Sequence, residues 1–66
     1  MINHLKELRT AQGWTQAELG DLLGVSRQAV IAIEADKHSP SLDLAFKIAA
    51  LFGTEVEAIF KNAYRH

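Results

Sequence analysis

The sequence predicts an all-α fold in which five short helices form a single compact domain. Apolar residues recur at spacings of three and four along most of the chain, which is typical of amphipathic helices. Glycines follow these apolar segments at positions 13, 24 and 53, where helices commonly end. Ser or Thr precedes most of the segments, as expected of helix N-caps.

The composition fits one small folded domain spanning residues 1–66. Hydrophobic residues make up 48% of the chain, which contains only one Pro and four Gly, so disorder is disfavoured. A chain of 66 residues lies near the lower limit for a self-sufficient core. We therefore expect oligomerisation to add stability.

Several classes of protein are disfavoured by what the sequence lacks. Without Cys there is no disulfide, no Cys-based zinc site and no thiol nucleophile, and His4, His38 and His66 lack the spacing of metal ligands. No catalytic set or Gly-rich phosphate loop stands out, so we expect no enzyme, no cofactor and no small-molecule ligand. Neither a signal peptide nor a membrane span is evident, and we expect a cytoplasmic protein.

The first predicted helix runs from about Ile2 to Gln12 and ends at Gly13. Its apolar stripe consists of Ile2, Leu5 and Leu8. The second helix begins at Thr15, whose spacing to Glu18 matches a capping box, in which each residue satisfies a backbone amide of the other.

The segment from about residue 15 to residue 35 predicts two short helices joined by a tight turn. Gly24 lies at the turn, Gly20 is small where the helices approach closely, and Ser26 caps the second helix of the pair. The inward-facing residues are Leu19, Leu23, Val30 and Ile33. This pattern indicates a helix-turn-helix unit, which holds its second helix in the major groove of DNA.

The rest of the chain predicts a polar loop over residues 36–40 and two further helices. Ser41 caps a fourth helix, which Gly53 ends. Its apolar positions are Leu42, Ala45, Ile48, Ala49 and Phe52. Thr54 and Glu57 repeat the capping-box spacing before a short fifth helix. The apolar residues of that helix are Val56, Ile59 and Phe60.

The start of the third helix carries the candidate base contacts. Arg27 can bind guanine and Gln28 can bind adenine through two hydrogen bonds each, while Ile31 suits a thymine methyl group. The alternative is that they are ordinary solvent-exposed residues. Gln16, at the start of the second helix, is a candidate phosphate contact. The polar loop offers further ones, Lys37, His38 and Ser39, although such a loop is often only solvated.

Two other features have structural interpretations. Arg9 and Glu34 each lie on a helix flank that is otherwise apolar, and an ion pair between the first and third helices accounts for both. Trp14 is interpreted as a partly buried packing residue rather than one that stacks on a base. The net charge is −1 and the isoelectric point is near 6.2, so we expect modest, salt-sensitive DNA affinity.

The stretch TQAELGDLLGVSRQAVIAIEADKHSPSLDLAFKIAALFG resembles the Cro and phage-repressor type of helix-turn-helix domain, the Xre family. The resemblance runs from about Leu5 to Phe60 and implies a compact five-helix, lambda-repressor-like domain. It implies DNA-facing roles for Ser26, Arg27, Gln28, Ile31 and Ala32, phosphate contacts by Gln16, Lys37 and Ser39, and a structural ion pair between Arg9 and Glu34. The chain departs from the family pattern at Asp36, which replaces glycine in a left-handed cap, and at Ile31, where a small polar residue is common.

The leading hypothesis is a sequence-specific regulator of transcription that binds double-stranded DNA. The resemblance implies a repressor that binds a palindromic operator as a homodimer. Residues from about 54 to 66 are the predicted dimerisation segment, because an apolar stripe there exceeds what a short helix can bury. Its members are Val56, Ile59, Phe60 and Tyr64. The alternatives are an antitoxin or restriction-system controller of the same fold, and a protein-interaction module that has lost DNA binding.

Overall fold

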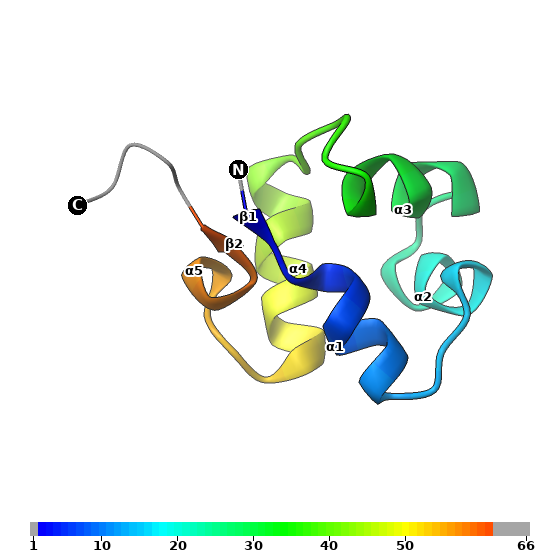
Figure 1. Cartoon of the computed structure of the whole chain (residues 1–66), viewed down its shortest axis with the longest axis horizontal. Coiled ribbons are helices and arrows are strands. Elements are labelled where there is room, and N and C mark those ends of the chain that lie inside the picture. Colours follow the sequence, from blue (N-terminus) through cyan, green and yellow to red (C-terminus); the bar gives the residue numbers. More distant parts are fainter. Residues whose placement is uncertain (1, 62–66) are drawn as a thin grey trace.

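The computed structural model describes residues 2–61 and shows the predicted helical domain (Figure 1). The elements, in chain order, are β1 (Ile2–Asn3), α1 (Leu5–Ala11), α2 (Gln16–Leu23), α3 (Arg27–Glu34), α4 (Leu42–Phe52), α5 (Val56–Ile59) and β2 (Phe60–Lys61). The helices α2 and α3 lie together at one end of the molecule, and α5 lies with the strands at the other end (Figure 1). The all-α prediction is confirmed, with a short two-stranded ladder added to it.

The ladder corrects the predicted start of the first helix. Asn3 pairs with Phe60 in an antiparallel register, so the residues before Leu5 are extended rather than helical. The Asn3 side chain accepts a hydrogen bond from the Leu5 amide at 2.9 Å and donates another to the Ile33 carbonyl. The His4 amide donates to the Ile59 carbonyl at 2.9 Å. Apart from the bond between Leu5 and Asn3, these contacts join residues far apart in the sequence, so helical periodicity alone does not predict them.

The N-caps of the three longer helices that follow α1 are as predicted. Thr15 Oγ1 accepts from the Glu18 amide at 3.0 Å, and the Glu18 carboxylate accepts from the Thr15 amide at 2.8 Å. Chiefly through the bond from the Thr15 amide, these contacts lower the pKa of the Glu18 carboxyl. Ser26 and Ser41 cap α3 and α4 through their hydroxyl oxygens, each at 3.1 Å.

The second predicted capping box, Thr54 with Glu57, is wrong. Glu55 is the N-cap of α5 and makes no side-chain capping bond. The reason lies in the end of α4, where Gly53 adopts a left-handed conformation with φ of 65°. The Thr54 amide then donates to the Ala49 carbonyl at 3.0 Å, so Thr54 completes the preceding helix end.

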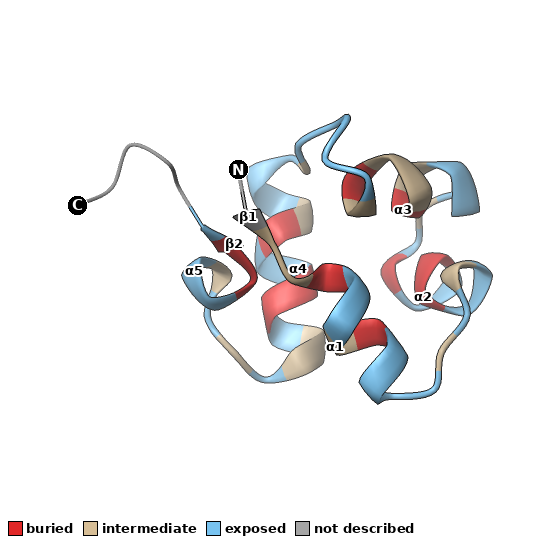
Figure 2. Cartoon of the chain, in the orientation of Figure 1, coloured by how far each residue is buried: buried red, intermediate tan, exposed pale blue. Residues whose placement is uncertain are grey.

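The core lies between the helices (Figure 2), and it includes Ile59 and Phe60 near the end of the described residues. Its buried apolar residues are Leu5, Leu19, Leu23, Val30, Ile33, Ala45, Ile48, Ala49, Ile59 and Phe60. Leu42 was predicted to belong to it and does not, since its side chain is 70% exposed. Leu42 is the first residue of α4, and in that first turn the leucine that packs against the core is Leu44. Trp14 is partly buried and its ring lies 5.7 Å from that of Phe52, as a packing residue would.

Candidate nucleic-acid interface

The turn between α2 and α3 is built on two glycines. Gly24 has φ of 73°, a left-handed conformation that L side chains rarely adopt. A Cβ atom on Gly20 would lie 2.8 Å from the Val25 carbonyl oxygen, too close for any side chain. The Val25 amide donates to the Gly20 carbonyl at 2.9 Å and closes the turn. The two glycines therefore allow α3 to pack directly against α2.

This packing turns one face of α3 into the core and the other outward. Val30 and Ile33 are buried, while Arg27 and Gln28 are exposed in the first turn. Ile31 is partly buried, as is its neighbour in the predicted base-contact set, Ala32. The exposed start of α3 thus presents a guanidinium and a carboxamide, which are the groups that read guanine and adenine edges.

The predicted pairing of Arg9 with Glu34 is present. Arg9 Nε lies 2.6 Å from Glu34 Oε2, and a second guanidinium nitrogen donates to Oε1 at 3.2 Å. The remaining terminal nitrogen donates to the Trp14 carbonyl at 2.8 Å. The two side chains are only 10% and 5% exposed. The pair therefore ties α1 to the end of α3 and to the segment that leads into α2.

Gln16 has a contact that sequence reasoning missed. Its Nε2 donates to Glu34 Oε1 at 3.1 Å, so the candidate phosphate residue is joined to the buried ion pair. Gln16 is the first residue of α2 and is partly buried. The helical spacing of α2 did not indicate this bond, because its partner lies eighteen residues further along the chain.

The loop after α3 begins with a strained residue. Asp36 has φ of 57°, the left-handed conformation expected there, and the Lys37 amide donates to the Ala32 carbonyl at 3.0 Å to close the helix. Lys37, His38 and Ser39 follow and are all exposed. Ser26, a further candidate phosphate contact, is exposed and uses its hydroxyl oxygen as the cap of α3.

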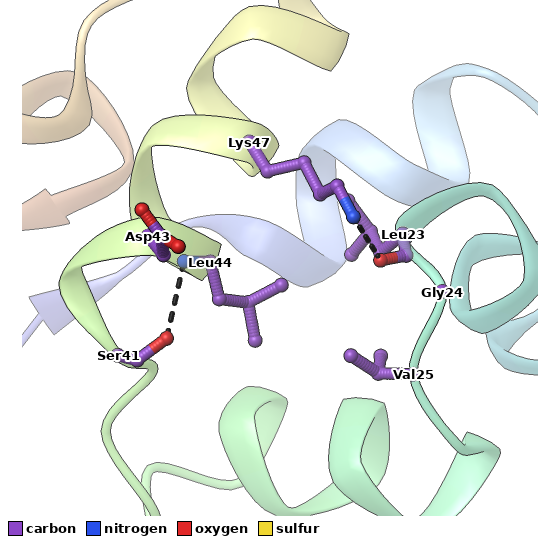
Figure 3. A pocket seen from close by; sticks show the side chains of 7 residues that line it. All are labelled: Leu23, Gly24, Val25, Ser41, Asp43, Leu44 and Lys47. Atoms are coloured by element: carbon purple, nitrogen blue, oxygen red, sulfur yellow. Dashed lines mark hydrogen bonds between the residues drawn. The ribbon is translucent and has the colours of Figure 1, made fainter.

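Lys47 is a residue that the sequence analysis overlooked. Its Nζ donates to the Leu23 carbonyl at 3.0 Å, at the end of α2, across an open hollow of about 400 Å³ (Figure 3). The hollow is lined by Leu23, Gly24, Val25, Ser41, Asp43, Leu44 and Lys47. A cation at the C-terminus of a helix is favourable, and this one connects α4 to the turn. The only signal for it was a single Lys within the otherwise apolar second half of α4.

The predicted dimerisation residues are not all on the surface. Ile59 is fully buried and Phe60 is 6% exposed, so within one protomer neither side chain belongs to an uncovered apolar patch. The ladder with β1 draws Phe60 into the core of the protomer. Val56 is partly buried, and Tyr64 lies outside the described residues. The large apolar side chains that are exposed within residues 3–61 are instead Leu22, Leu42 and Phe46.

The described residues contain neither a metal-binding cluster nor a membrane-spanning helix. No three His or acidic side chains among them are arranged to hold a metal ion. Within residues 2–61 no helix has the length and apolar character needed to cross a membrane.

Comparison with known proteins gives a consistent result. Residues 5–59 match a family model described as helix-turn-helix. An uncharacterized HTH-type transcriptional regulator of Methanocaldococcus jannaschii is 55% identical over 60 residues, which cover 91% of each chain. One from Bacillus subtilis is 47% identical with the same coverage, and one from Archaeoglobus fulgidus is 40% identical over 91% of this chain and 86% of its own. The chain therefore belongs to the Xre-type helix-turn-helix family, a family of transcriptional regulators rather than enzymes.

Proposed function

We propose that this protein binds double-stranded DNA sequence-specifically and represses transcription. The observation that carries the proposal is the glycine-built turn, which leaves the first turn of α3 exposed with Arg27 and Gln28 on it. In this arrangement the start of α3 enters the major groove, and these two side chains bind base edges. Ile31 and Ala32 add apolar contacts to thymine methyl groups. We expect a regulator of this kind to be located in the cytoplasm, together with the chromosomal DNA that it binds.

Phosphate contacts orient the domain on the duplex. Gln16 and Ser26 lie at the starts of α2 and α3, where backbone amides favour an anion. Lys37, His38 and Ser39 contact the backbone from the loop after α3. Such contacts carry no sequence information and make the affinity depend on salt.

The active species is a homodimer on a palindromic operator. The protomer has a radius of gyration of 11.0 Å, so one copy cannot reach two major-groove faces about 34 Å apart. The helix-turn-helix unit lies at one end of the long axis and α5 at the other (Figure 1). Two copies that meet away from the helix-turn-helix end would hold their recognition helices apart, as two half-sites require.

The described surface best suited to a second copy lies on α4. Leu42 and Phe46 are one helical turn apart and are 70% and 59% exposed. About a two-fold axis, these two side chains of one copy would pack against the same two side chains of the other. Val56, which is partly buried, and Tyr64, which lies outside the described residues, remain candidate members of the dimer interface.

Selection of bound sequences from random DNA, followed by native mass measurement, tests the proposal. An inverted repeat bound by two chains is expected. On the selected site, Arg27→Ala and Gln28→Ala each weaken binding by about 1–3 kcal/mol, and each changes the preferred bases. Gln12→Ala is the matched control, because Gln12 is an exposed glutamine at the end of α1.

Two outcomes would contradict the proposal. If neither Arg27→Ala nor Gln28→Ala alters the base preference, α3 does not read the sequence. If the wild-type protein shows no steep loss of affinity with salt, the chain is a protein-interaction module instead.

A further inference from the structure

The buried carboxylate of Glu34 serves two partners at once. Its Oε2 accepts from Arg9 Nε at 2.6 Å. Its Oε1 accepts from a second Arg9 nitrogen at 3.2 Å and from Gln16 Nε2 at 3.1 Å. The Glu34 side chain is 5% exposed, so these bonds form in a region from which water is largely excluded. The ion pair is therefore continuous with the side chain at the start of α2.

This arrangement fixes which way the Gln16 amide faces. A flipped amide would place its carbonyl oxygen against the carboxylate oxygen of Glu34, two acceptors with no proton between them. With Nε2 toward Glu34, one of its two N–H groups is used and the second is free to donate elsewhere. Arg9 neutralises the carboxylate at the same time, so that a phosphate near Gln16 does not face an uncompensated negative charge.

We propose that Glu34 is a positioning residue for DNA binding, whose carboxylate holds Gln16 Nε2 so that its second N–H meets a DNA phosphate. The inference rests on the proposed function. A side chain that is already held in its binding conformation loses less conformational entropy when the phosphate arrives. The hydrogen bond from Gln16 to Glu34 also links the proposed phosphate-binding residue at the start of α2 to the last turn of the recognition helix α3.

The first test uses the free wild-type protein and nuclear magnetic resonance. One side-chain amide proton of Gln16 is expected to exchange with water about tenfold more slowly than those of Gln12 and Gln28, which are exposed. Addition of a mixed-sequence DNA duplex of about 20 base pairs, long enough for two half-sites, should shift the other Gln16 amide proton. Equal exchange at all three glutamines would overturn the proposal. This measurement needs no variant and holds even if Glu34 cannot be replaced.

The second test is a double-mutant cycle on affinity for the same duplex. Glu34→Gln leaves one neutral acceptor oxygen where two charged ones served Arg9 and Gln16, so the hydrogen bond that holds the Gln16 amide is weakened. Gln16→Ala is expected to weaken binding about tenfold, and Glu34→Gln about fivefold. In the Gln16→Ala background, Glu34→Gln should change the affinity less than about twofold. Ile48→Val, a core change in α4, is the control for lost stability and should leave the affinity unchanged.

The outcomes separate this inference from the proposed function. Additive effects in the cycle would show that Glu34 is merely structural, while DNA binding itself stands. A wild-type protein that binds neither this duplex nor any selected site would overturn both.

Discussion

Replacing Arg9 by Met should destabilise the protein strongly while leaving the shape of the core nearly intact. Met is unbranched and apolar, so the main change is the loss of the guanidinium that pairs with Glu34 at 2.6 Å. Of the three hydrogen bonds that the carboxylate accepts, only the one from Gln16 remains. A buried carboxylate with so few donors is unfavourable in a region of low dielectric constant.

The magnitude follows from the burial of the pair. Breaking a fully buried pair costs about 3–5 kcal/mol, and the 10% exposure of the Arg9 side chain places this one near the lower end, about 3 kcal/mol. In a domain of this size each kcal/mol shifts the melting temperature by about 4–8 °C. The expected decrease is therefore about 12–24 °C.

The assay is thermal unfolding followed by circular dichroism, with all proteins at one concentration because the proposed dimerisation would change the apparent stability. Lys6→Met on the same helix is the matched control, since Lys6 is exposed and its loss should change stability by less than about 0.5 kcal/mol. The double variant Arg9→Met with Glu34→Leu removes the stranded carboxylate and should recover most of the lost stability. The reasoning is refuted if Arg9→Met melts like the control, or if the double variant is no more stable than the single one.

Three further predictions concern assembly, pH and the loop after α3. Phe46→Asp should convert the proposed dimer to a folded monomer in sedimentation at micromolar concentration, whereas Leu22→Asp, at a residue of α2 that is 50% exposed, should remain a dimer; a dimeric Phe46→Asp protein would exclude the α4 surface. The pKa of the Glu18 carboxyl is lower in the folded state, so the ionised carboxylate stabilises the fold above the ordinary Glu pKa, and this stabilisation is lost as the pH falls through the lowered pKa. The difference in melting temperature between wild type and Glu18→Gln should therefore shrink below about pH 4. A difference that is constant with pH would contradict this prediction. Asp36→Asn keeps a residue that tolerates φ of 57° and removes a negative charge beside the loop that we propose binds phosphates. Affinity for duplex DNA in a fluorescence anisotropy titration should therefore rise about two- to fivefold, equivalent to about 0.5–1 kcal/mol, and an unchanged affinity would place Asp36 away from DNA.

The two capping-box patterns show how far local sequence reasoning extends. Thr15 and Glu18 form the box as predicted, because Thr15 follows an irregular segment and its amide has no other partner. Thr54 and Glu57 have the same spacing, yet the amide of Thr54 is used by the end of α4. The spacing of a motif is a local property, whereas the availability of its backbone groups depends on the neighbouring element.

The burial of two apolar residues in the predicted dimerisation segment has a related cause. Helical periodicity placed Ile59 and Phe60 on a stripe too wide for a short helix to bury. In the structure Phe60 leaves the helix and pairs with Asn3 from the other end of the chain, which buries it in the protomer. Leu42 shows the converse, since its spacing matches the core face but its side chain is 70% exposed.

By itself the sequence determined the features that depend on a few neighbouring residues. These are the five helices, the left-handed turn at Gly24, the caps at Thr15, Ser26 and Ser41, and the exposed start of α3. Each rests on backbone sterics or on a hydrogen bond within one turn.

Only the tertiary structure decided the contacts between distant residues. The strand ladder, the bond from Lys47 to the end of α2 and the bond from Gln16 to Glu34 each join residues that no local pattern relates. Arg9 and Glu34 were predictable as a pair, because two charges on apolar helix flanks require a partner. The Glu34 carboxylate also accepts a hydrogen bond from Gln16. This bond depends on how α1, α2 and α3 pack, and packing is a property of the whole chain.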